Sequence, residues 1–175
     1  PTRSDATPVR FLGEEWSALV AHAARGCTSR GLGCDFTLGT LWPFGGSFVR
    51  PEHSSRTWRG PSNQRLVRSW EQAYGEPTPV LDHLSETAIS EYARRITTAL
   101  GAAIRAAKTP ALFTDSWEVD PEGLWTADLP ELFCRRHGYD ITPFMEDLDA
   151  HPPQRYDYRE LLSQLVLERF FRPLS

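Results

Sequence analysis

The stretch Ala111–Val119, with the sequence ALFTDSWEV, joins an apolar segment directly to a polar one. It follows residues 84–104, where apolar side chains recur at the spacing of one helical face. A short apolar run just after an amphipathic helix is typical of a buried strand in an α/β protein. The sequence therefore predicts a buried strand over residues 111–115.

On both sides of this strand, the sequence alternates between helical and extended patterns. The other predicted elements, in chain order, are a helix from Glu14 to about Cys27, a strand over Leu32–Thr40, a loop over residues 43–63, a short extended piece within Arg65–Tyr74, a helix over Asp128–His137 ended by Gly138, a short helix after Pro143, and a helix over residues 158–171. This order favours an α/β fold with parallel strands.

Both main predicted strands end in long loops that carry glycine and tryptophan. In α/β barrels, the loops after the carboxyl ends of the strands build the active site. A complete barrel needs about 250 residues, whereas this chain has 175. We therefore expect a partial (β/α)8 TIM barrel, with residues 1–175 as a single segment and the remaining βα units outside this sequence.

Composition and charge exclude two classes of partner. Hydrophobic residues make up 40% and charged residues 24%, which is ordinary for a globular domain. A net charge of −4 argues against nucleic acid, because phosphate binding requires a clustered positive surface. No apolar run approaches the roughly 18 residues of a membrane helix, and no signal peptide opens the chain. The missing initial Met and the end just after an apolar run at Ser175 lead us to expect a fragment.

The three cysteines have no metal-type spacing and are odd in number. Free buried thiols are therefore predicted for Cys27, Cys34 and Cys134. A disulfide between two of them remains open, so the sequence does not fix the redox compartment.

The acids of the DSWE motif are the first candidates for chemistry. On a continuous strand Asp115 and Glu118 would face opposite ways, but Pro121 and Gly123 favour an early end, which lets both converge on one cleft. A carboxylic acid in an apolar wall keeps its proton at neutral pH and donates it to a glycosidic oxygen. Trp117 would supply that wall and a face for a sugar ring. The structural alternative is a helix N-cap at Asp115 or Asp120 and a surface Glu beside a core Trp.

Two further tryptophans lie in loops after predicted strands. Trp42 precedes the pair Gly45-Gly46, which allows close backbone approach to a ligand. Alternatively, aromatic residues staple this loop to its own domain. Trp125 closes the loop that carries Asp120 and Glu122, which are either metal ligands or solvated acids. No HExxH or GxSxG motif is present, which argues against zincin and serine-nucleophile chemistry.

Three blocks of this sequence resemble, in the same order, those of the glycoside hydrolase family 106 α-L-rhamnosidases. The blocks are CDFTLGTLWPFGGSFVRPE (34–52), LFTDSWEVDPEGLWTADLPELFCRRHGYDITPFM (112–145) and RYDYRELLSQLVLERFFRPL (155–174). The middle block is the most specific of the three. Ser47 stands where family members usually have a proline, which puts only the stiffness of that loop in doubt.

The resemblance implies a (β/α)8 barrel that removes terminal α-L-rhamnosyl groups from a rhamnose-containing glycoside or polysaccharide, with inversion and with calcium at the sugar. It implies Glu118 as the general acid and Asp115 as the residue that orients the sugar or supports Glu118. The residues expected to line the rhamnose pocket are Trp42, Gly45, Gly46, Trp117 and Trp125. The general base is expected beyond the C-terminus, so this chain alone should be inactive. Export by bacteria, to the periplasm or the medium, is a further implication.

Two alternatives remain open at this stage. One is another (β/α)8 glycosidase, such as a β-galactosidase-like enzyme, although its acid commonly lies in an Asn-Glu pair and this chain has Trp117-Glu118. The other is a non-catalytic barrel remnant that binds carbohydrate through its tryptophans.

Overall fold

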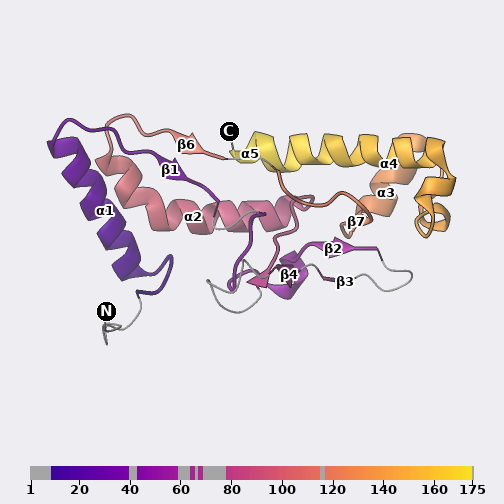
Figure 1. The fold of residues 1–175 in the computed structure, drawn as a ribbon, viewed down its shortest axis with the longest axis horizontal. Coiled ribbons are helices and arrows are strands. Elements are labelled where there is room, and N and C mark those ends of the chain that lie inside the picture. Colours follow the sequence, from indigo (N-terminus) through magenta and orange to yellow (C-terminus); the bar gives the residue numbers. More distant parts are fainter. Residues whose placement is uncertain are drawn as a thin grey trace, which may run out of the picture. The chain divides into compact units, whose positions relative to one another are not determined.

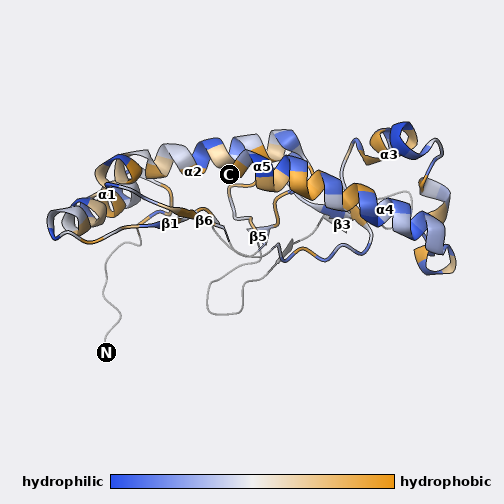
Figure 2. Cartoon of the chain, turned by 90° about the horizontal axis from the view of Figure 1, so that it is seen from above, coloured by the Kyte–Doolittle hydropathy of each residue, from blue (hydrophilic) through white to orange (hydrophobic). Residues whose placement is uncertain are grey.

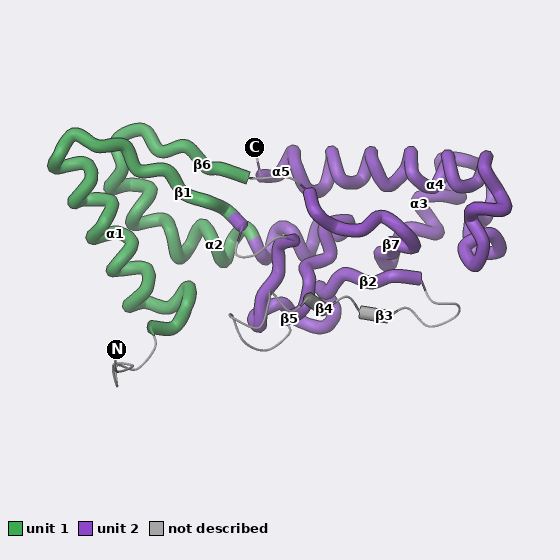
Figure 3. Tube along the Cα trace, in the orientation of Figure 1, with its two compact units in different colours: residues 1–38, 93–115 green, residues 39–92, 116–175 purple. Residues whose placement is uncertain are grey.

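The computed structural model describes residues 9–39, 43–58, 64–65, 67–68, 78–114 and 117–174 (Figure 1). The chain divides into two compact units (Figure 3). Unit 1 comprises residues 1–38 and 93–115, and unit 2 comprises residues 39–92 and 116–175.

The described residues contain five α-helices and several shorter helical turns. The α-helices are α1 (Glu14–Ser29), α2 (Glu86–Ala106), α3 (Leu129–His137), α4 (Pro152–Leu165) and α5 (Arg172–Leu174). The short helices are the 3-10 helices η1 (Pro51–His53), η3 (Thr142–Phe144) and η4 (Leu148–Ala150) and the π-helix η5 (Val166–Phe171). The predicted helices over 14–27, 84–104, 128–137 and 158–171 are thus confirmed, and the one after Pro143 is a 3-10 turn.

The strands are short, two residues each. They are β1 (Phe36–Thr37), β2 (Arg56–Thr57), β3 (Gln64–Arg65), β4 (Val67–Arg68), β5 (Thr78–Pro79), β6 (Leu112–Phe113) and β7 (Leu124–Trp125). The segment 43–63 is therefore more than a loop, since it carries η1 and β2.

Unit 1 contains the parallel strand pair that the sequence predicts. Strands β1 and β6 pair in parallel, with Phe36 opposite Leu112. The Asp35 carboxylate accepts a hydrogen bond from the Ala111 amide at 2.9 Å, which fixes the start of this pairing. Phe36 and Leu38 are buried and Thr37 is exposed, as the alternating pattern predicts.

Two details of the predicted packing in unit 1 are wrong. Leu112 and Phe113 of β6 are 46% and 54% exposed, so β6 is not a buried strand. Its apolar residues favour extended structure, but only β1 pairs with it among the described strands. In α1, the helical spacing of Trp16, Leu19, Val20 and Ala23 predicts one apolar face. Leu19 is exposed, however, whereas Ala21 and Ala24 are buried, so the buried face is rotated from the predicted one.

Unit 2 is built from antiparallel pairs and helices. Strand β2 pairs antiparallel with both β3 and β7, and β4 pairs antiparallel with β5. Helix α3 begins with Pro130 in its first turn and ends at Gly138, which adopts φ +80°. A glycine in this left-handed conformation is a common helix terminator because it has no side chain to clash.

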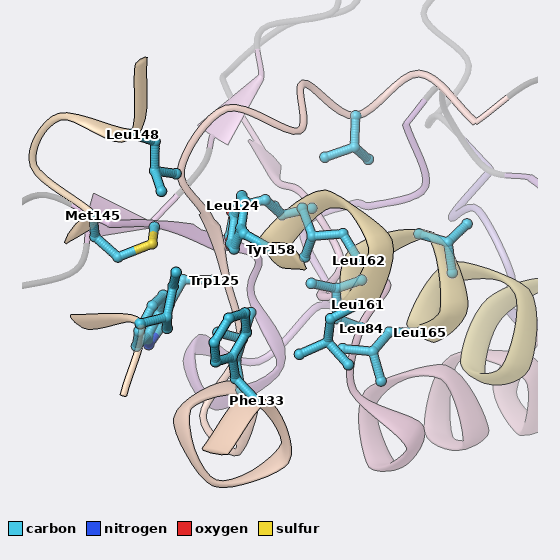
Figure 4. Packing of buried hydrophobic residues seen from close by; sticks show 14 residues of the cluster. Leu84, Leu124, Trp125, Phe133, Met145, Leu148, Tyr158, Leu161, Leu162 and Leu165 are labelled. Carbon is cyan, nitrogen blue, oxygen red and sulfur yellow. The ribbon is translucent and has the colours of Figure 1, made fainter. Parts of the chain in front are cut away.

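The hydrophobic core of unit 2 gathers residues from β7, α3, α4 and the loops around them (Figure 4). Its members include Leu84, Leu124, Phe133, Tyr158 and Leu162, each at most 3% exposed. In Figure 2, hydrophobic and hydrophilic residues alternate along α4, as expected for a helix that buries one face.

The pair Gly45-Gly46 has a structural explanation within unit 2. Gly45 forms an antiparallel bridge with Val80, and a Cβ at Gly45 would lie 2.3 Å from the Pro79 carbonyl oxygen. Gly46 adopts φ +144° and its amide donates to the same oxygen at 3.1 Å. Gly45 is therefore required by close backbone approach to residues 79–80, and Gly46 by its positive φ and by the Phe48 ring, which a Cβ would meet at 2.7 Å.

Candidate functional site

The segment that carries the DSWE motif leaves β6 before the first acid of that motif. Strand β6 ends at Phe113, and residues 117–120 are not in a strand. The predicted early end of the strand is thus confirmed. Asp115 lies outside the described residues, so its convergence with Glu118 stays a prediction.

Trp117 is anchored by a histidine far away in the sequence. Its indole Nε1–H donates a hydrogen bond to Nδ1 of His83 at 3.0 Å. The indole is half-buried and packs against the hydrophobic core of unit 2. This contact joins the DSWE motif to the segment that directly precedes α2.

Glu118 lies between two residues that face inward. Trp117 is half-buried and Val119 is 6% exposed, whereas Glu118 is exposed. The expectation that the Glu118 carboxyl is enclosed by apolar residues is therefore wrong for the described structure. The two anchored neighbours hold this stretch of backbone in place, while the Glu118 side chain remains exposed.

The two acids of the following loop have structural roles. The Asp120 carboxylate accepts a hydrogen bond from the Glu122 amide at 3.0 Å, which stabilises the turn. Glu122 forms an ion pair with Arg159 of α4. These contacts explain both acids without a metal.

A pocket of about 460 Å³ lies beside Trp117. It is lined by Trp117, Pro121, Arg159, Leu162, Ser163 and Val166. This volume is in the range of small-molecule sites, about 300–1,000 Å³. The pocket offers one aromatic face, aliphatic side chains and the polar groups of Arg159 and Ser163, a combination that suits a sugar ring.

His83 is buried among aromatic side chains. Its ring stacks on Phe170 of the π-helix at 4.6 Å and meets the Phe44 ring edge-on at 5.8 Å. Burial lowers the pKa of His83 to about 3, although a backbone hydrogen bond with Phe44 acts in the opposite direction. The imidazole is therefore neutral at physiological pH, as an Nδ1 that accepts from Trp117 requires.

Asp82, the neighbour of His83, is also buried. Its carboxylate accepts hydrogen bonds from the Thr126 hydroxyl at 2.8 Å and from the Leu84 amide at 3.0 Å. Burial raises the pKa of Asp82 to about 6, while these two bonds act to lower it. Asp82 therefore ties the segment before α2 to the end of β7.

Among the residues that the structure describes, the other predicted pocket residues do not line this pocket. Trp42 lies outside the described residues, and Gly45 and Gly46 are occupied by backbone contacts with residues 79–80. Trp125 is 6% exposed and belongs to the hydrophobic core, where its ring lies 4.7 Å from that of Trp58. Stacking on a sugar requires an exposed ring face, so we leave Trp125 out of the site.

The parts of the chain that the structure describes do not provide an evident calcium site. Within those ranges, no group of three or more His, Cys, Asp or Glu side chains is arranged to hold a metal ion. Calcium at the sugar stays a prediction, and no step below depends on it. Cys27, Cys34 and Cys134 are free thiols as predicted, but the prediction that they are buried is wrong: Cys27 and Cys34 are half-buried and Cys134 is exposed.

Sequence reasoning missed His83 and Asp82. The signal was the polar pair that follows Val80-Leu81 just before α2, since polar residues at the end of an apolar segment are candidate site residues. The partners lie 34 and 44 positions away, at Trp117 and Thr126, and short-range patterns do not show such contacts.

Comparison with known proteins defines the class to which the chain belongs. Residues 79–174, more than half of the chain, match the family model described as alpha-L-rhamnosidase, which places the chain among the glycoside hydrolases. The chain belongs to glycoside hydrolase family 106, and the matched region contains His83, Trp117 and Glu118. No curated protein and no solved structure matches the chain. Within the described ranges, every helix is too short or too polar to cross a lipid bilayer.

Proposed function

We propose that this chain carries part of the active site of an α-L-rhamnosidase, with Glu118 as the general acid. The observation that carries the proposal is the family match over residues 79–174, which includes the Trp117-Glu118 pair. The family relationship also favours a rhamnose-containing glycoside as the substrate. It disfavours the β-galactosidase-like alternative.

The geometry around Trp117 supports a sugar at this position. The half-buried indole borders the pocket of about 460 Å³, so its exposed part offers an apolar face for the C–H surface of a pyranose. Arg159 lines the same pocket and carries hydrogen-bond donors for sugar hydroxyls. Glu118 directly follows Trp117 and is exposed, although it is not among the described residues that line this pocket.

In the proposed reaction, Glu118 donates its proton to the glycosidic oxygen as the bond to the rhamnosyl carbon breaks. In an inverting enzyme, a general base roughly 6.5–9.5 Å from the acid activates water on the opposite face of the sugar. We assign no general base in this chain, and its expected place outside residues 1–175 stays a prediction. Substrate contacts or further parts of the protein would have to exclude water around Glu118, because this carboxyl is exposed here.

We also propose that the fold is part of a (β/α)8 barrel. The parallel pair β1–β6 and the placement of α2 before β6 support this, since parallel strands joined through helices are the repeating unit of that fold. Export to the periplasm or the medium also stays a prediction.

The test is Glu118→Gln in the protein that carries this sequence, with Glu122→Gln as the matched control. Both acids lie in the same loop, and the two changes remove the same charge with the same shape. We expect Glu118→Gln to lower kcat on an unactivated α-L-rhamnoside by roughly 100- to 10,000-fold, because general acid catalysis contributes about that much. Glu122→Gln should remain within a few-fold of the parent.

Normal turnover by Glu118→Gln would remove this residue from the acid role. Sugar-induced quenching of tryptophan fluorescence with no hydrolysis by the parent protein would instead support the non-catalytic binding alternative.

A further inference from the structure

We propose that His83 is a positioning residue that holds the Trp117 indole and thereby sets the direction in which the Glu118 side chain projects from the loop. This inference rests on the proposed role of Glu118. It names a residue on another segment of unit 2, 34 positions before Trp117, whose contribution passes through one hydrogen bond.

Hydrogen bonds on both sides of His83 hold its segment of the chain in place. On one side, Asp82 is held by the Thr126 hydroxyl and by the Leu84 amide. On the other side, the Leu84 carbonyl accepts a hydrogen bond from Arg169 at 2.7 Å, and Arg169 is itself paired with Asp128 at 2.8 Å. His83 therefore stands between two neighbours whose positions are fixed.

The ring itself is fixed by packing. His83 is 2% exposed and is stacked on Phe170, which is 1% exposed. Phe170 belongs to the π-helix η5, and such helices are frequent at functional sites. Because contacts hold both the backbone around His83 and the faces of its ring, Nδ1 points in one direction.

Packing alone does not explain a histidine at this position. A phenylalanine would fill the same aromatic surroundings without a desolvation cost, whereas His83 buries Nε2 without a hydrogen bond of good geometry, which costs free energy that a contact at Nδ1 has to offset. The hydrogen bond from the Trp117 indole requires an acceptor such as Nδ1, which phenylalanine lacks. Because the ring is neutral, Nδ1 keeps its lone pair for that bond over the whole physiological pH range.

The consequence for Glu118 follows from chain connectivity. Trp117 precedes Glu118 directly, and Val119 on the other side is buried in the core. If the indole lost its anchor, the backbone at 117 would be free to rotate while 119 stayed fixed, so the Glu118 carboxyl would move. A displacement of about 1 Å at a reacting group costs up to 100-fold in rate.

The test uses two changes at His83 in the protein that carries this sequence. His83→Phe keeps an aromatic ring and removes the acceptor, whereas His83→Asn places an amide oxygen close to the position of Nδ1. We expect His83→Phe to lower kcat on the rhamnoside roughly 10- to 100-fold with little change in KM. His83→Asn should recover at least part of this loss.

Two readouts separate a positioning role from a merely structural one. The Trp117 indole N–H signal in a ¹⁵N-tryptophan NMR spectrum, assigned by its loss in Trp117→Phe, should move upfield in His83→Phe. The double variant His83→Phe/Trp117→Phe should be no slower than the slower single variant, because both changes break the same contact.

An unmoved indole signal, additive losses in the double variant, or equal losses in His83→Phe and His83→Asn would overturn the positioning role. Failure of the proposed function would give a different result. Glu118→Gln would then keep its activity, while the indole signal of Trp117 would still move when His83 is replaced by Phe.

Discussion

Strands β6 and β7 stand on either side of the Trp117-Glu118 pair in the sequence, and their side chains have opposite environments. Leu112 and Phe113 of β6 are about half exposed, whereas Leu124 and Trp125 of β7 are 1% and 6% exposed. The two dipeptides are almost equally apolar, so apolar character produces a strand in both places but does not decide its burial. Burial comes from the partners, which for β7 are β2, α3 and α4.

The largest expected difference in stability follows from this contrast. Leu124→Ala should lower the free energy of unfolding by about 3 kcal/mol, because it opens a cavity in a packed core. Leu112→Ala, the matched change in β6, should cost less than about 1 kcal/mol, since Leu112 is 46% exposed. Urea denaturation of both variants measures the difference. Equal losses would contradict the contrast between the strands.

A second contrast compares two glycines, one from each unit. Gly45→Ala should destabilise the protein by about 1–3 kcal/mol, because its new methyl group would meet the Pro79 carbonyl oxygen at 2.3 Å. Gly33→Ala is the control, since its new methyl group would have no neighbouring atom within 4 Å and its φ is not in the left-handed region. It should change stability by less than about 1 kcal/mol. A tolerated Gly45→Ala would show that the loop does not need close approach to residues 79–80.

The buried pair Asp82-His83 predicts how acid affects unit 2. The pKa of His83 falls from 6.5 to about 3, so below pH 6.5 the unfolded chain takes up a proton that the folded protein does not, and stability falls with the pH. Asp82 acts in the opposite direction between about pH 6 and 3.8, because its pKa is raised on folding. The shift of His83 is the larger of the two, so together the pair should lose stability as the pH falls towards 3.

The variant His83→Phe tests the predicted direction in which pH changes the stability. It removes the histidine proton and leaves that of Asp82, so its stability relative to the parent should improve as the pH falls from 6.5 towards 3. Denaturation curves of both proteins across this range give the difference directly, and other titrating groups cancel. A relative stability that does not change with pH would contradict the assignment of a buried neutral His83.

The smallest effect is expected at the Arg159–Glu122 ion pair. Its side chains are 49% and 59% exposed, so Glu122→Gln should cost less than about 1 kcal/mol of stability. A thermal melt at low and at high salt measures the loss and its screening. A larger loss would mean that the loop after Glu118 depends on this pair more than its exposure implies.

Local patterns predict the elements of this chain well because helical spacing and apolar runs act over a few residues. Helix α2 and the end of α3 at Gly138 are examples, and so is the parallel pairing of β1 with β6. The exposure of Phe113 depends on elements that are distant in the sequence, so local sequence patterns do not predict it. The aromatic loops are compatible in sequence with either ligand binding or packing, and in the structure Gly45 and Trp125 serve packing.

The candidate site shows the same limit. Trp117 and Glu118 stand out in the sequence as an acid beside an aromatic ring after an apolar strand. The exposure of Glu118 and the anchoring of Trp117 by His83 depend on contacts across unit 2, which become visible only in three dimensions.

The central claim is that Glu118 protonates the departing oxygen, and a series of leaving groups tests it most directly. Glu118→Gln should be compared with the parent protein on aryl α-L-rhamnosides whose phenols span a wide range of pKa, and on an unactivated alkyl rhamnoside. If Glu118 is the acid, the variant should lose the most kcat/KM on the alkyl rhamnoside and the least on the most acidic phenol, because a good leaving group needs little protonation. A loss that is the same for every leaving group, or no loss, would contradict the account.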